Sequence, residues 1–258
     1  MKFLKYTIFC LSFLASSVAF TACKDDTDMP TPTDMVGNLN IEFENVVGDS
    51  PLELNRRAPY FTPSGDDFTV SIFRYYISNI KLKRADGTEF VQPESYYLVD
   101  QERDQSRKFT IPNVPAGDYT QLTFILGVDA ARNTAGAQTG ALAVSDMFWS
   151  WDSGYIFTKL EGRSSKSPNQ ALAFHIAGFQ PPHNTIRNVS PAMNNKIIQV
   201  RQTRTPKIRL RADVLRMFTG TTTILFKDVY NVMGGESAAK IADNQEGGMF
   251  TVNQIDSN

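Results

Sequence analysis

Hydrophobic and polar side chains alternate over short stretches along most of the chain, which is the pattern of half-buried β-strands. The alternation is clear over residues 39–43 and 68–72. It resumes over residues 75–82 in shifted phase, which predicts that the second strand continues after a bulge. The same pattern predicts further strands at 96–99, 108–111, 119–128, 155–161, 171–176, 197–201, 207–212 and 222–226.

Turn-forming residues separate these stretches. Asp86-Gly87 is typical of a hairpin turn, and Pro181-Pro182 interrupts the pattern later in the chain. Only residues 213–218 and 236–242 read as helical, and both segments are short. About ten regularly spaced strands with one or two short helices predict an all-β fold, an antiparallel β-sandwich.

The N-terminus has the pattern of a secretory signal over residues 1–22. Two lysines precede an apolar stretch, residues 6–19, that is too short to cross a bilayer comfortably. Small residues then lead into Cys23, and this arrangement resembles a bacterial lipobox. We therefore expect lipidation at Cys23, and the alternative is an ordinary cleaved signal followed by a chance cysteine.

The residues after Cys23 predict how the protein is displayed. Lys24-Asp25-Asp26 resembles the signal by which Bacteroidetes send lipoproteins to the outer face of the outer membrane; the alternative is a solvated charged tail. Residues 23–37 are rich in Asp, Thr and Pro without periodicity, so they predict a flexible tether. About 14 such residues reach about 20 Å. A single β domain is then expected over residues 38–258.

Charge and cysteine content exclude several functions. There are 26 Lys and Arg against 27 Asp and Glu, so no basic surplus indicates nucleic-acid binding. Of the two cysteines, Cys10 leaves with the signal and Cys23 would carry the lipid, so the mature domain has no thiol for a disulfide, a metal site or a nucleophile. The chain also has no GxSxG elbow and no phosphate-cradling GxxxxGK[ST] motif, and we expect a binding protein, not an enzyme.

The scarce side chains that could bind a ligand gather in one segment. Both tryptophans and both histidines lie within residues 149–183. Trp149 and Trp151 would point to the same face of an extended strand, as core or sugar-stacking residues often do. His175 shares its strand face with small alanines, which leaves space for a metal or ligand; a core histidine bonded to backbone is the alternative. His183 follows two prolines and reads as a loop residue at the surface.

Several motifs follow one another along the mature chain. They are Phe73-Arg74-Tyr75-Tyr76-Ile77-Ser78-Asn79-Ile80, Tyr97-Leu98-Val99-Asp100, Val114-Pro115-Ala116-Gly117-Asp118-Tyr119, Phe124-Ile125-Leu126-Gly127-Val128-Asp129 with Asn133, Gly154-Tyr155-Ile156-Phe157, Lys159-Leu160-Glu161-Gly162 and Phe174-His175-Ile176. In this order they resemble the MbnP family of secreted proteins. The resemblance spans roughly Asn38 to Phe250.

The resemblance implies copper binding. Members of the family are periplasmic or outer-membrane copper proteins paired with a MauG-like dihaem peroxidase, which oxidises a tryptophan of its partner to kynurenine. In similar proteins, histidine and kynurenine together hold Cu(I). Carried onto this chain, His175 is the motif histidine, Trp149 or Trp151 is the oxidation target, and His183 is a candidate second ligand.

One departure and one alternative remain open. Many family members follow the motif histidine with a glycine- and cysteine-containing loop, whereas residues 177–183 here contain no cysteine. The alternative function is a non-enzymatic module that presents Trp149, Trp151 and Tyr155 to a glycan or a protein.

Overall fold

The computed structural model describes residues 35–135, 138–143, 145–150 and 153–257. A first sheet is built around β1 (Val36–Val47), which pairs with β14 (Lys207–Asp213) in parallel. β16 (Phe250–Asp256) extends this sheet beyond β14, and β7 (Lys108–Pro115) and the short β2 (Ser50–Pro51) pair with β1.

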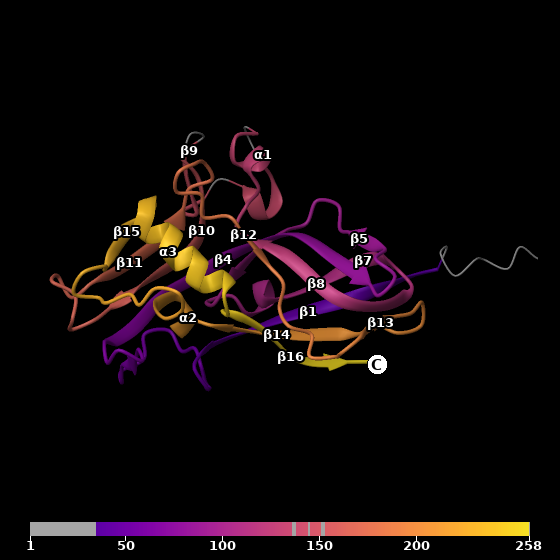
Figure 1. Ribbon diagram of the computed structural model, residues 1–258, viewed down its shortest axis with the longest axis horizontal. Helices are drawn as coiled ribbons and strands as arrows, with labels where there is room; N and C mark the ends of the chain where they lie inside the picture. Colours follow the sequence, from indigo (N-terminus) through magenta and orange to yellow (C-terminus); the bar gives the residue numbers. More distant parts are fainter. Residues whose placement is uncertain (1–34, 136–137, 144, 151–152, 258) are drawn as a thin grey trace, which may run out of the picture. The chain divides into compact units, whose positions relative to one another are not determined.

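A second, larger sheet is built around β4 (Asp67–Arg84), with β8 (Gly117–Leu126) on one side and β10 (Gly154–Arg163) on the other. β11 (Leu172–Ala177) pairs with β10, and β15 (Asn231–Met233) runs parallel to β11 (Figure 1). Short strands complete the sheet: β3 (Tyr60–Phe61), β5 (Glu89–Val91), β6 (Tyr96–Asp100), β9 (Phe148–Ser150), β12 (Arg187–Val189) and β13 (Ile198–Val200).

Aromatic side chains join the inner faces of the two sheets. Phe43 of β1 makes edge-on contacts with Tyr75 of β4 at 5.8 Å and with Phe124 of β8 at 6.3 Å between ring centroids. Phe250 of β16 packs against the same rings. All four are buried, so the fold is the predicted β-sandwich. The pairing is mostly antiparallel, and β1–β14 and β11–β15 are parallel additions.

The predicted bulge and hairpin are present. The pairing of β4 with β10 skips a residue between Val70 and Ile72, which is the bulge that the change of phase predicted. A second irregularity, in the pairing of β4 with β8 between Ser78 and Lys81, was not predicted, and Asn79 there has a left-handed φ of 52°. β4 then turns into β5 through Gly87, with Lys83 opposite Glu89.

The strand predicted at 222–226 is wrong. Ile224 and Phe226 are buried as the pattern suggested, but their backbone N–H groups bond to the Phe218 carbonyl and the Asp66 carboxylate. No neighbouring strand runs beside them among the described residues, so this is a buried connection whose apolar side chains fill the core.

The helices are few and short, as expected. α1 (Ala130–Asn133) and α2 (Leu215–Phe218) are single turns, and two 3₁₀ turns span Asp104–Arg107 and Gly140–Leu142. α3 (Gly235–Glu246) is longer than predicted, and Figure 1 shows it alongside β11 and β15, which it contacts through its buried face. Within the described part of the chain, no helix is long and apolar enough to cross a membrane.

Candidate metal centre

A row of four side chains crosses the second sheet on the face away from the core. The register places Arg74 of β4 opposite Lys159 of β10, Lys159 opposite His175 of β11, and His175 beside Met233 of β15. Side chains alternate along a strand, so the preceding or following residues point into the core. Those buried residues are Phe73, Leu160, Phe174 and Val232.

His175 has one ring nitrogen bonded and the other free. Its side chain is 12% exposed, and Nε2 lies 2.9 Å from Oε1 of Glu161. A carboxylate only accepts hydrogen bonds, so Nε2 carries the proton and Nδ1 presents a lone pair. Nδ1 is buried and finds no hydrogen-bond partner among the described residues. The alternative of a histidine held by backbone is therefore not what the structure shows.

The cations beside His175 have carboxylate partners. Asp146 Oδ2 lies 2.7 Å from Arg74 and 3.1 Å from Lys159 Nζ, and Lys159 also lies 3.5 Å from Glu161. Burial raises the pKa of Asp146, but its hydrogen bond to Lys159 and the charges of Lys159 and Arg74 outweigh burial, so the pKa is lowered overall. This pairing reduces the electrostatic cost of bringing another cation to His175.

Trp149 is the tryptophan that the structure places at His175. It lies in β9, which pairs with β10, and its ring centroid is 6.1 Å from that of His175 at an interplanar angle of 43°. The indole is 39% exposed, so it borders solvent as well as the imidazole. Trp151, the other candidate for oxidation, lies outside the described residues. So does Cys23, the candidate for lipidation.

The buried side chain of Asn133 holds the start of β10, the strand that pairs with β9. Asn133 Nδ2 donates to the carbonyls of Val128 and Asp129, and its Oδ1 accepts from the backbone N–H of Tyr155 at 2.9 Å. Gly154 has a φ of 75°, and a Cβ there would lie 2.2 Å from Asn133 Oδ1. These motif residues therefore fix the start of β10, the strand with which β9 and its Trp149 pair.

Trp149 and Met233 line one pocket together with His183, with a volume of about 330 Å³. His183 is half-buried in the loop between β11 and β12. Met233 is 48% exposed and was not predicted from the sequence. A methionine followed by Gly234-Gly235 is a weak signal alone, because only the pairing of β15 with β11 puts its side chain beside His175.

The donor set is soft. In the ranges that the structure describes, no three His, Cys, Asp or Glu side chains come together as metal ligands. The groups here that can donate to a metal are an imidazole and a thioether, which suit Cu(I) better than Mg²⁺ or Ca²⁺, whereas the unmodified indole of Trp149 has no lone pair to offer.

The alternative function, a module that presents Trp149, Trp151 and Tyr155 to a glycan or a protein, requires all three side chains to be exposed. Tyr155 is fully buried and packs edge-on against Tyr76, with ring centroids 5.5 Å apart. It therefore cannot stack on a glycan, and the prediction that Tyr155 is presented is wrong. Tyr155 belongs to a second buried cluster with Tyr76 and Met147, and its hydroxyl donates to the Leu142 carbonyl.

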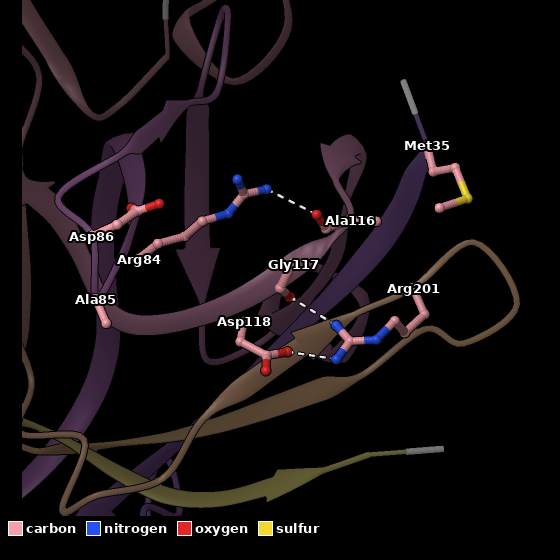
Figure 2. Close-up of a pocket in the computed structure, with 8 residues that line it drawn as sticks. All are labelled: Met35, Arg84, Ala85, Asp86, Ala116, Gly117, Asp118 and Arg201. Atoms are coloured by element: carbon pink, nitrogen blue, oxygen red, sulfur yellow. Dashed lines mark hydrogen bonds and ion pairs between the residues drawn. The ribbon is translucent and has the colours of Figure 1, made fainter. Parts of the chain in front are cut away.

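A second pocket, of about 540 Å³, lies at the other end of β4 (Figure 2). The two arginines that line this pocket already donate hydrogen bonds to other lining residues. Arg84 donates to the Ala116 carbonyl, and Arg201 donates to the Gly117 carbonyl and the Asp118 carboxylate. Both histidines lie elsewhere, so this pocket is the weaker candidate for a metal.

The comparisons with known proteins identify the family. A family model, MbnP, matches residues 36–234. The solved structure of MbnP from Methylosinus trichosporium is similar with a TM-score of 0.50 and 15% sequence identity, covering 72% of this chain and 79% of that one. No curated protein matches. Because the family model covers most of the chain, including β11 and β15, this protein belongs to the MbnP family.

Proposed function

We propose that this protein is a lipid-anchored copper-binding protein that takes Cu(I) through His175 and a kynurenine formed from Trp149. It would serve copper acquisition or storage and would not itself be an enzyme. A MauG-like dihaem peroxidase is the proposed partner. The lipid on Cys23 would hold the domain at the outer membrane, with the segment after it directing the protein to the cell surface.

The observation that carries the proposal is the unpaired, buried Nδ1 of His175. A buried polar atom without a partner costs free energy, so it usually has a role. Metal-binding histidines commonly donate their other ring N–H to a carboxylate, which fixes the tautomer and makes the ligand more basic. The bond from Nε2 to Glu161 provides that arrangement.

Oxidation would convert Trp149 into a ligand. The C2–C3 bond of the indole breaks, and two molecules of hydrogen peroxide supply two oxygen atoms and leave as water. These oxygens form a ketone and a formamide, and hydrolysis then releases the formyl carbon as formate and leaves an aromatic amine. Trp149 is suited to this step because it borders solvent, where an oxidising partner can approach, and also faces His175.

The product has donor atoms that tryptophan lacks. An indole N–H only donates a hydrogen bond, whereas kynurenine offers an amine lone pair and a carbonyl oxygen. With the ring of Trp149 about 6 Å from the imidazole, one metal ion fits between the two groups. His183, which lines the same pocket, is a candidate additional ligand.

The first experiment is a peptide mass map of the protein from native membranes, with and without copper limitation. The tryptic segment from Asn133 to Lys159 holds both tryptophans. We expect a gain of O₂ with loss of CO at Trp149. Modification at Trp151 alone, or at neither residue, would contradict the assignment of Trp149.

The second experiment is a Cu(I) competition titration. We expect His175→Ala to lose most of the Cu(I) affinity, and His183→Ala to serve as the comparison, because His183 lines the pocket that Trp149 and Met233 line. Unchanged affinity in His175→Ala would refute the proposal. If the fluorescence of the tryptophans responds to glycans and not to copper, the binding-module alternative replaces it.

A further inference from the structure

We infer that the thioether of Met233 is a further ligand of the Cu(I) site, on the same side of the sheet as His175. This inference rests on the proposed function, since it assigns a donor to the same metal. It concerns a residue that the histidine and tryptophan pattern did not indicate.

The first argument is strand register. Met233 is the direct partner of His175 in the parallel ladder of β11 and β15, and their preceding residues Phe174 and Val232 are both buried. The side chains of Met233 and His175 therefore leave the sheet on the same face. Adjacent strands lie about 4.8 Å apart, which is within the reach of a methionine side chain with three rotatable bonds.

The second argument is exposure at the pocket. Met233 is 48% exposed, whereas Met147, Met217 and Met249 are at most 1% exposed and fill the core. Six large hydrophobic residues are exposed in the described ranges, and two of them, Met233 and Trp149, line the same pocket. Met233 and Trp149 thus form an exposed apolar surface at this pocket, and Met233 pairs directly with His175, whose Nδ1 has no hydrogen-bond partner among the described residues.

The third argument is the chemistry of the donors. Thioether sulfur is a soft neutral ligand that selects Cu(I), and neither Mg²⁺ nor Ca²⁺ favours it. The mature domain contains no cysteine, so methionine is its only source of sulfur. Neutral sulfur and imidazole would leave the single positive charge of Cu(I) in place, and the carboxylates of Asp146 and Glu161 beside Arg74 and Lys159 would offset it.

Backbone geometry keeps Met233 at this place. Gly234 and Gly235 follow it with φ values of 97° and 77°, a conformation that side chains rarely adopt. The chain thus turns sharply from β15 into α3, and α3 packs against β11 and β15. Met233 is the last residue of β15, the edge strand of the second sheet, and it comes directly before that turn.

The test compares Met233→Leu with the wild-type protein, both isolated from native membranes and loaded with Cu(I). Met35→Leu is the matched control, because Met35 is a partly exposed methionine that lines the other pocket. X-ray absorption at the copper edge should show a sulfur neighbour in the wild type and in Met35→Leu, and none in Met233→Leu. Cu(I) affinity should fall at least about tenfold in Met233→Leu only.

A second readout uses Ag(I), a redox-inert soft cation, and methionine labelled with ¹³C at its methyl group. One methyl resonance should shift on titration, and it should be missing from the spectrum of Met233→Leu. If copper binds without sulfur and with equal affinity in Met233→Leu, the inference about Met233 is overturned and the site at His175 stands. If the wild type binds no Cu(I), the inference and the proposed function both fail.

Discussion

Glu161 offers the sharpest test of the histidine geometry. Its Oε1 lies 2.9 Å from Nε2 of His175, so it holds the tautomer that leaves Nδ1 free. The variant Glu161→Gln keeps the shape of the side chain but loses its charge. Lys159 keeps its partner Asp146 at 3.1 Å, so the variant leaves no buried cation alone.

The magnitude follows from the bond that changes. A hydrogen bond to a charged group contributes about 1.5–3 kcal/mol, and a neutral one contributes about 0.5–1.5 kcal/mol. The difference of about 1–1.5 kcal/mol corresponds to about a 5- to 13-fold weaker Cu(I) affinity. The Glu161 side chain is 32% exposed, so solvent screening favours the lower end of that range. Glu161→Ala, which removes the acceptor, should cost about 10- to 100-fold.

The assay is competition for Cu(I) with a chromophoric chelator at fixed pH, combined with ¹⁵N spectra of the apo-protein that report the tautomer of His175. Glu89→Gln is the control, because Glu89 is also a strand carboxylate paired with a lysine, Lys83, at 3.2 Å. We expect the control to match the wild type. Unchanged affinity in both Glu161 variants, with Nε2 still protonated, would refute the role given to Glu161.

Four further predictions concern the anchor and the scaffold. Cys23→Ala should move the protein from the membrane fraction to the soluble fraction, as fractionation and blotting would show. Gly154→Ala should destabilise the fold by about 1–3 kcal/mol in urea unfolding, because its Cβ would collide with Asn133 Oδ1. Phe226→Ala should cost about 3–5 kcal/mol, since a fully buried ring is removed; a surface strand residue would cost far less. The pKa of Asp146 is lowered from 3.8, so its contribution to stability is present above that pH and is lost as the pH falls through the lower folded-state value. Asp146→Asn should therefore flatten the acid-induced loss of stability measured by pH-dependent unfolding.

Most strands could be predicted from the sequence because each strand buries one face, which makes apolar and polar residues alternate. Alternation over 39–43, and over 68–72 and 75–82, corresponds to β1 and β4, and the shifted phase marked a real bulge between Val70 and Ile72. The error at 222–226 has the same physical origin. A buried connection also alternates apolar and polar side chains when its backbone groups find partners such as Asp66. Local pattern reports burial, and only the neighbouring chain decides whether a strand forms.

For the candidate site, too, the sequence determined some features and the tertiary structure decided others. The sequence by itself determined the fold class and the absence of cysteine after residue 23, and it singled out His175 as a candidate ligand, because these depend on composition, periodicity and ordered motifs. Only the tertiary structure brought Glu161, Trp149 and Met233 to His175, since the register of β9, β10 and β11 and the pairing of the distant β15 with β11 decide which side chains meet. The tertiary structure also buries Tyr155, which the sequence reading had expected at the surface. The physical reason is that strand pairing and register, which place side chains on one face of a sheet, are set by contacts between residues far apart in sequence.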